Sequence, residues 1–196
     1  MAADLPELLL PGASQWRTWL EENHSGSPGV WLVLHKKGGT VTTLTYAQAL
    51  DEALCFGWID GQTRKRDAES SFQRFTPRGP RSIWSLRNVG HIARLEEEGK
   101  MHDAGRAAVE LAKADGRWER AYAGPATAVV PDDLAAAIAA NPDAQAMFDV
   151  LTSQNRYALL FRLSQLKTEV GRKKRIESFV DMLARHETPY PQKRKP

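Results

Sequence analysis

The segment from Cys55 to Asn88 constrains the fold most, because it combines strand-forming residues, fixed turns and many arginines. Two stretches within it, Trp58–Arg66 and Ser71–Arg78, have the composition of short β-strands, and a polar turn joins them. Pro77 and Pro80 follow, and neither can continue a strand ladder. The segment therefore predicts a hairpin that ends in a rigid loop.

A third strand is indicated by VWLVLHKK, residues 30–37, which is apolar and rich in β-branched residues and ends at two glycines. Between this strand and the hairpin, Thr45 and Gln48 have the spacing of a capping box. The helix that they start is expected to stop at Gly57, the left-handed position after a helix end. We thus expect a small antiparallel sheet from about residues 30–37, 57–66 and 71–78.

Three further helices are expected around this sheet. Ser14 is positioned to cap a helix that ends near Asn23. Ser82 or Ser85 is positioned to cap a helix that continues to about residue 98, and Asp103 to cap one that continues to about residue 114.

The chain is expected to change character at Tyr122–Val130, a small, apolar and uncharged stretch that is the best linker candidate. The pattern after it is helical throughout, beginning at Pro131. The predicted class is α+β, with a small antiparallel sheet covered by helices and followed by a C-terminal helical module. The predicted domains are residues 1–125, the helical module 131–187, and a mobile basic tail, 188–196.

The net charge of +3 is unevenly distributed, because residues 1–60 carry three Lys/Arg and seven Asp/Glu. The remainder therefore carries +7, which favours anionic partners such as phosphates, nucleic acid or lipid head groups, with a plain solvated surface as the alternative. Cys55 is the only cysteine, so no intramolecular disulfide can form, and we expect it to be a buried thiol. No apolar run reaches the roughly 18–20 residues of a membrane span, and the N-terminus is acidic. We expect a cytoplasmic protein.

The loop PRGPRSIWSLRN, residues 77–88, is the strongest local signal for a ligand. Prolines fix its backbone, arginines supply forked donors, and serines stand where a helix begins, a combination that suits a phosphate or carboxylate. The predicted ligand-binding residues are Asp60, Arg78, Arg81, Ser82, Trp84, Ser85 and Asn88.

Three other interpretations stay open. In the first, the arginines of the loop pair with Asp60, Asp67 or the acids of the first helix and only stabilise the fold. In the second, Arg172–Arg175 form a nucleic-acid groove for which stacking platforms are expected at the tryptophans Trp31, Trp58 and Trp84. In the third, Asp60 and the arginine loop form an enzyme site.

No catalytic residue can be named from the sequence, and it predicts neither a cofactor nor a metal site. His91, His102 and Asp103 lack the close repeat spacing of zinc ligands. The oligomeric state is left open.

Several blocks of the chain are similar to the YdeI/OmpD-associated family of bacterial proteins, also described as bacteriocin-protection proteins. The N-terminal blocks are SQWRTWLEENH, GVWLVLHKK, LTYAQALDEALCFGWIDG, FTPRGPRSIWSLRN, GKMHDAG and DGRWERAY. The helical end, from PDDLAAAIAANPDAQAMFDVL to GRKKRIESFVDML, resembles the C-terminal module of that family. One departure lies in LSQLKTEVGRKKRI, where Val170 and Gly171 replace part of the pattern AK-x-x-ET-R-x-x-RI.

The resemblance implies a role in resistance to antimicrobial peptides or in envelope stress, and it brings no catalytic residues with it. We therefore expect a non-enzymatic stress or resistance protein that binds an anionic small molecule or partner through the arginine loop. Nucleic-acid binding and an enzymatic use of Asp60 are the alternatives.

Overall fold

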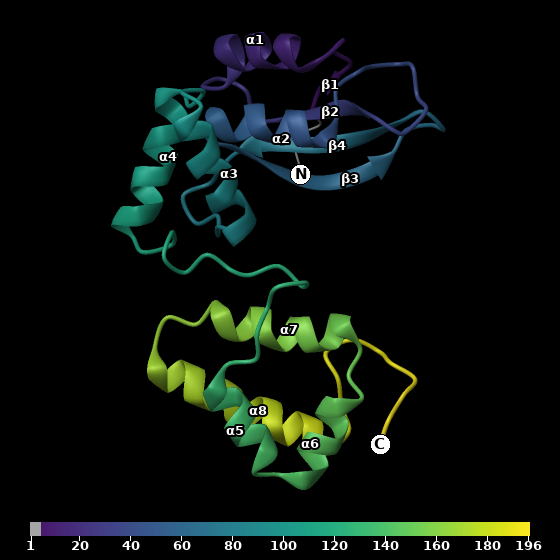
Figure 1. Ribbon diagram of the computed structural model, residues 1–196, viewed down its shortest axis with the longest axis vertical. Helices are drawn as coiled ribbons and strands as arrows, with labels where there is room; N and C mark the ends of the chain where they lie inside the picture. The colour runs from purple at the N-terminus through teal and green to yellow at the C-terminus, as the bar shows by residue number, and fades with distance from the viewer. Residues whose placement is uncertain (1–4) are drawn as a thin grey trace. The chain divides into compact units, whose positions relative to one another are not determined.

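The computed structural model describes residues 5–196, and its internal contacts divide the chain into two compact units (Figure 1). The first unit contains the described residues up to Trp84 together with Asn88–Glu119. The second contains Ser85–Arg87 and Arg120–Pro196. The first four residues of the predicted N-terminal domain lie outside the described residues.

The first unit contains a four-stranded sheet with the strand order β1-β2-β4-β3. Its strands are β1 (Glu7–Leu8), β2 (Val30–His35), β3 (Trp58–Lys65) and β4 (Ser70–Pro77). The last three are the predicted strands, and β4 pairs antiparallel with both β2 and β3. The two-residue β1 was not predicted, and it pairs parallel to β2. The α+β class is confirmed, although the sheet is not purely antiparallel.

The helices of the first unit are α1 (Ala13–Asn23), α2 (Tyr46–Cys55), α3 (Leu86–Glu97) and α4 (Asp103–Ala114). Each agrees with a predicted helix to within a few residues. Two predicted caps are wrong.

The N-cap of α1 is Gly12, and Ser14 lies inside the helix, where its hydroxyl donates to Gln15. The N-cap of α4 is His102, whose ring Nδ1 accepts the Ala104 amide. In both cases the helix begins before the serine or aspartate that the sequence suggested as its N-cap.

One face of the sheet packs against α1 and α2, which Figure 1 shows over the same side. The Trp16 ring of α1 lies 5.7 Å from Phe75 on β4 and 6.3 Å from Trp58 on β3, measured between ring centroids. All three rings are at most 1% exposed. Burial of these large rings contributes to the apolar stabilisation of the unit.

The predicted capping box of α2 is confirmed, because Thr45 and Gln48 bond reciprocally. The helix ends in front of Gly57, whose φ is 73°, as the sequence predicts. The Gly57 carbonyl then accepts the amide of Arg78 at 2.9 Å, so the end of α2 holds the start of the loop that follows β4.

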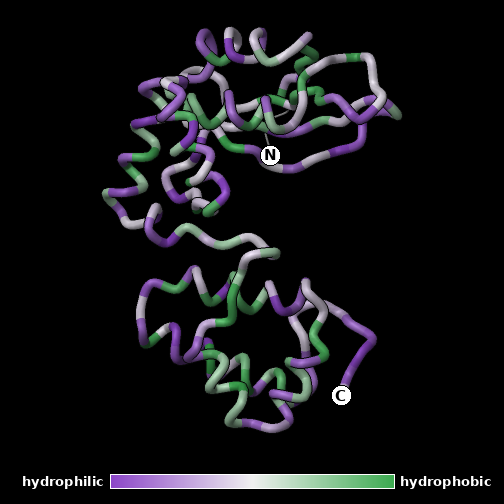
Figure 2. Tube along the Cα trace, viewed as in Figure 1, coloured by the Kyte–Doolittle hydropathy of each residue, from purple (hydrophilic) through white to green (hydrophobic). Residues whose placement is uncertain are grey.

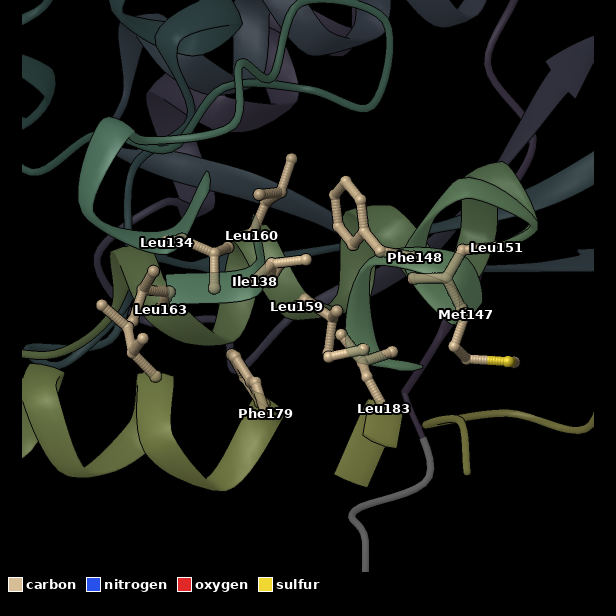
Figure 3. Packing of buried hydrophobic residues seen from close by; sticks show 12 residues of the cluster. Leu134, Ile138, Met147, Phe148, Leu151, Leu159, Leu160, Leu163, Phe179 and Leu183 are labelled. Atoms are coloured by element: carbon tan, nitrogen blue, oxygen red, sulfur yellow. The ribbon is translucent and has the colours of Figure 1, made fainter. Parts of the chain in front are cut away.

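The second unit contains the four helices α5 (Asp132–Ala139), α6 (Pro142–Asp149), α7 (Ser153–Ser164) and α8 (Glu169–Ala184). Apolar side chains from all four meet in one core, and Figure 3 shows several of them pointing toward one another. Those that are at most 1% exposed are Leu134, Ile138, Ala144, Met147, Leu159, Leu163 and Leu183.

The C-terminal tail, which Figure 2 shows as increasingly hydrophilic toward its end, contacts the second unit. Asn155, at the start of α7, donates to the Tyr190 carbonyl at 3.0 Å and accepts the Tyr190 amide at 2.8 Å. Asn155 also donates to Gln192, whose amide group donates to the Val150 carbonyl. These bonds hold the tail against the second unit as far as Gln192. The mobility expected of residues 188–196 stays a prediction.

None of the helices within residues 5–196 combines the length and apolar character that a membrane crossing requires.

Candidate functional site

The loop from Arg78 to Trp84, which we call the arginine loop, is closed by contact between its two ends. The guanidinium carbon of Arg78 lies 3.6 Å from the centroid of the Trp84 ring, and Arg78 Nη1 donates to the Ile83 carbonyl at 2.9 Å. Trp84 is 1% exposed, so Arg78 packs against a buried ring. The contacts fix the conformation of the loop.

Within the loop, Ser82 and Arg81 have different environments. The Ser82 amide donates to the Gly79 carbonyl at 3.0 Å, so this amide is used inside a turn. Arg81 is exposed, and no ion pair links it to a carboxylate among the described residues. Within the loop, Arg81 is therefore exposed to solvent, whereas Arg78 packs against the buried Trp84 ring.

The structure adds Arg117 and Trp118, which the sequence analysis did not select. After α4, Gly116 takes a φ of 72°, a left-handed conformation that favours glycine, and the Trp118 amide donates back to the Ala112 carbonyl. This turn brings Arg117 to the arginine loop, where Nη1 donates to the Ser82 carbonyl at 2.9 Å. The Trp118 ring packs against Trp84, with 4.9 Å between the ring centroids.

Asp115 orients the Arg117 side chain. The Arg117 Nε donates to the Asp115 carboxylate oxygens at 2.8 and 2.7 Å. The Arg117 side chain is only 11% exposed, whereas that of Asp115 is 41% exposed. The guanidinium is therefore held on two sides, by Asp115 and by the Ser82 carbonyl.

Two donors at this junction are buried and have no acceptor among the described residues. They are the indole Nε1 of Trp84 and the Nη2 of Arg117. A buried donor left without an acceptor destabilises a protein by about 1–3 kcal/mol. Trp84 belongs to the arginine loop and Arg117 donates to it, so both donors lie on side chains of the same junction.

Asp60 lies on β3, where its Oδ2 accepts the Tyr46 hydroxyl of α2 at 2.8 Å. Two arginines that follow Asp60 closely in the sequence pair with other acids, Arg64 with Glu7 and Arg66 with Asp67. The described hydrogen bond of Asp60 thus connects the sheet to α2.

Ser85 and Asn88 stand at the start of α3. Ser85 forms an isolated parallel bridge with Tyr122, and the Leu86 amide donates to the Tyr122 carbonyl at 2.9 Å. One amide at this helix start is therefore used by the backbone. Asn88 is buried, at 7% exposure. Of the predicted site residues, Arg78 and Trp84 are in direct contact, and Ser82 of the same loop is bonded to Arg117.

Cys55 lies at the end of α2 and has no exposed surface. Burial, with the nearby Glu52 carboxylate as the second cause, raises the pKa of its thiol from 9.0 to about 11. The side chain therefore has the environment of a buried structural thiol, as the sequence predicts.

The geometry of the tryptophans bears on the nucleic-acid interpretation. Trp58 and Trp84 are each 1% exposed, and their rings are therefore not accessible to bases. In the basic run of α8, Arg172 forms a bidentate ion pair with Asp133: Nε donates to Oδ2 at 2.6 Å and Nη2 donates to Oδ1 at 2.7 Å. This arrangement does not favour the stacking groove that the nucleic-acid interpretation requires.

Arg117 and Trp118 lie in the block DGRWERAY, and one signal there could have identified them. An arginine and a tryptophan follow directly after a glycine that ends a helix. Such a glycine turns the chain back toward the helix it follows, which places the next side chains against neighbouring elements.

Comparison with known protein families returned two matches. Residues 8–108 match the domain of unknown function DUF8412, and residues 127–186 match the family described as bacteriocin-protection, YdeI or OmpD-associated. The predicted resemblance to that second family is thus confirmed for the helical end. Most of the N-terminal blocks lie in the first match, and DGRWERAY lies between the two.

Searches of curated proteins and of solved structures gave no match. The first match covers just over half of the chain. The chain therefore belongs to the DUF8412 family, and its residues 127–186 are similar to the bacteriocin-protection, YdeI/OmpD-associated family.

Proposed function

We propose that this protein contributes to bacteriocin protection without catalysing a reaction, by binding a small anion at the junction of the arginine loop and Arg117. The observation that carries the anion part is the pair of buried donors, Trp84 Nε1 and Arg117 Nη2. An anion oxygen would give these donors the acceptor that the described protein atoms do not supply.

The charges around the junction favour an anion. Arg78 and Arg117 contribute two positive charges, Arg81 adds a third at the surface of the same loop, and the Asp115 carboxylate is paired with Arg117. A hydrogen bond to a charged group contributes about 1.5–3 kcal/mol to stability or binding. Since the guanidinium groups of Arg78 and Arg117 are already fixed by Trp84, Asp115 and backbone carbonyls, these two side chains would lose little conformational entropy on binding.

The bacteriocin-protection part rests on residues 127–186 and on the description of the family that they match. It is separable from the anion part, which rests on the first unit alone. The non-enzymatic part rests on the kind of groups at the junction, which are hydrogen-bond donors and guanidinium groups that recognise charge. The cytoplasmic location expected from the single cysteine stays a prediction.

The anion part is tested by titration calorimetry of the whole chain with inorganic phosphate, pyrophosphate and acetate. We expect wild type to bind at least one of them and Arg117→Ala to bind it about 10- to 100-fold more weakly, as loss of a charge-assisted contact implies. Arg185→Ala is the matched control, because Arg185 also pairs with an acid two residues away, Glu187, but is 60% exposed. Its affinity should equal that of wild type.

Two results would contradict the anion part: no binding of any of the three anions, or equal binding by wild type and Arg117→Ala. If Arg117→Ala does not fold, Arg117→Lys keeps the charge but loses the forked geometry, and it should bind about tenfold more weakly.

The protection part is tested by bacterial survival. Susceptible cells that produce the wild-type chain should survive a bacteriocin better than cells that produce none. If protection is lost in Arg117→Ala but kept in Arg185→Ala, the anion junction serves the protection. Equal protection by all three chains would separate the anion junction from bacteriocin protection, and no protection by wild type would contradict the role itself.

A further inference from the structure

A groove of about 380 Å³ lies between α3 and α4, which are neighbours in the first unit (Figure 1). Its apolar lining includes Ile92, Met101 and Val109, which are 5–6% exposed, and the ring of Trp118. The volume falls within the range of roughly 300–1,000 Å³ that is typical of small-molecule sites, near its lower end. The groove is suited to a single apolar chain or ring.

Paired charges surround this apolar lining. Arg106 bonds to Glu96 at 3.0 Å across the groove, from α4 to α3, and Lys113 bonds to Glu110 at 2.8 Å. Lys113 Nζ also lies 5.9 Å from the centroid of the Trp118 ring. The carboxylates of the rim are thus neutralised, and a cation stands at the Trp118 end.

Trp118 connects the groove to the arginine loop. It lines the groove, its ring contacts Trp84, and the residue before it is Arg117. Arg117 does not line the groove itself, but it lies one residue from a lining residue, within the same unit of the protein.

We propose that the ligand of the arginine loop is an amphiphilic anion with one apolar chain. Its phosphate or carboxylate head binds at Arg117 and Trp84, and its chain lies in the groove between α3 and α4. This inference rests on the proposed function, since the head group occupies the same junction. The size of the groove favours one short chain over the two chains of a membrane phospholipid.

The test compares four probes by titration calorimetry of the whole chain, below their aggregation concentrations: inorganic phosphate, butyl phosphate, octyl phosphate and octanol. Octanoate serves as a fifth probe to distinguish a carboxylate head from a phosphate head. Each additional methylene group buried strengthens binding by up to about fourfold, so octyl phosphate should bind at least tenfold more tightly than inorganic phosphate. Butyl phosphate should lie between them, and octanol should bind more weakly than octyl phosphate.

The groove is blocked by Ala93→Trp, because Ala93 lines it from an exposed position on α3. We expect this variant to bind octyl phosphate no more tightly than inorganic phosphate, and to keep the wild-type affinity for inorganic phosphate. Ala107→Trp is the control, at an exposed position of α4 that is not part of the lining. It should bind all probes as wild type does.

The outcomes separate this inference from the proposed function. If octyl phosphate binds no more tightly than inorganic phosphate, the groove has no part in binding and the inference is overturned, while the anion junction stands. If octyl phosphate binds equally well to Arg117→Ala, the chain binds without the head-group contact, which also overturns it. Sedimentation with phosphatidic acid vesicles that depends on Arg117 would point to a membrane lipid and contradict a free single-chain ligand.

Discussion

The guanidinium carbon of Arg78 lies over the Trp84 ring, 3.6 Å from the ring centroid, so the first and last residues of the arginine loop are in contact. The Trp84 ring is in turn packed against Trp118, and Arg117 donates to the Ser82 carbonyl in the middle of the loop. The loop is therefore held from within by Arg78 and from outside by Arg117. Fold stabilisation and ligand recognition, which the sequence presents as alternatives for these arginines, are compatible in this geometry.

The stacking of Arg78 predicts a difference between two arginines only three residues apart. Arg78→Ala should lower the free energy of unfolding by about 1–3 kcal/mol, because it removes a cation–π contact and the bond to the Ile83 carbonyl. Arg81→Ala, at an exposed position, should change it by less than about 0.5 kcal/mol. Urea denaturation followed by tryptophan fluorescence measures both. An equally large loss in Arg81→Ala would show that Arg81 has a structural role.

Two buried tryptophans provide a matched pair for the indole donor. Trp84 Nε1 has no acceptor among residues 5–196, whereas Trp58 Nε1 donates to the His24 carbonyl at 3.2 Å. Trp84→Phe should weaken phosphate binding by about 3- to 10-fold, the value of one hydrogen bond, and Trp58→Phe should leave it unchanged. The free energy of unfolding should fall more in Trp58→Phe than in Trp84→Phe, because only Trp58→Phe removes a described hydrogen bond. Calorimetric titration and urea denaturation check the two orders, and equal affinities in the two variants would contradict the role of Trp84.

The close approach of α4 to the end of α2 predicts an intolerant glycine. A Cβ at Gly105 would lie 2.1 Å from the Cys55 carbonyl oxygen, which is backbone and cannot move aside easily. Gly105→Ala should therefore destabilise the protein by about 1–3 kcal/mol or more. At Gly90 in α3 a Cβ meets nothing within 4 Å, and Gly90→Ala should stabilise by up to about 1 kcal/mol. Thermal melts of the two variants should shift in opposite directions.

Burial of Cys55 predicts a thiol that is unreactive at neutral pH. Its pKa is raised from 9.0 to about 11, so the thiol contributes to stability below pH 9 and this contribution is lost as the pH rises toward 11. At pH 8 the native protein should react with a thiol reagent much more slowly than the urea-unfolded protein. Equal rates for native and unfolded chains would show that the thiol is accessible.

Local patterns predicted most elements of the fold. The capping box of Thr45 and Gln48 needs only residues three apart, and the left-handed Gly57 follows from the end of the same helix. The missed strand, β1, has two residues and exists only because it pairs with Trp31 and Leu32 of β2. Such a strand has no local signature, since its partner lies more than twenty residues along the chain.

The candidate site was predictable only in part, for the same reason. Arg78 and Trp84 lie in one short segment whose prolines and arginines attract attention. Arg117 and Trp118 reach that segment from the end of α4, through a turn at Gly116 and a bond from Arg117 to Ser82, 35 residues away. The cap at His102 was missed because the neighbouring Asp103 is a more typical capping residue.

The central claim, that the junction of the arginine loop and Arg117 binds an anion, is tested most directly by the indole N–H resonance of Trp84. Titration of the ¹⁵N-labelled chain with inorganic phosphate can follow the indole signals of all six tryptophans, and Trp84→Phe identifies the one that belongs to Trp84. We predict that this signal moves downfield and saturates with phosphate, that the Trp58 indole signal stays in place, and that Arg117→Ala abolishes the shift. A Trp84 signal that does not respond to phosphate, or that responds equally in Arg117→Ala, would contradict the account.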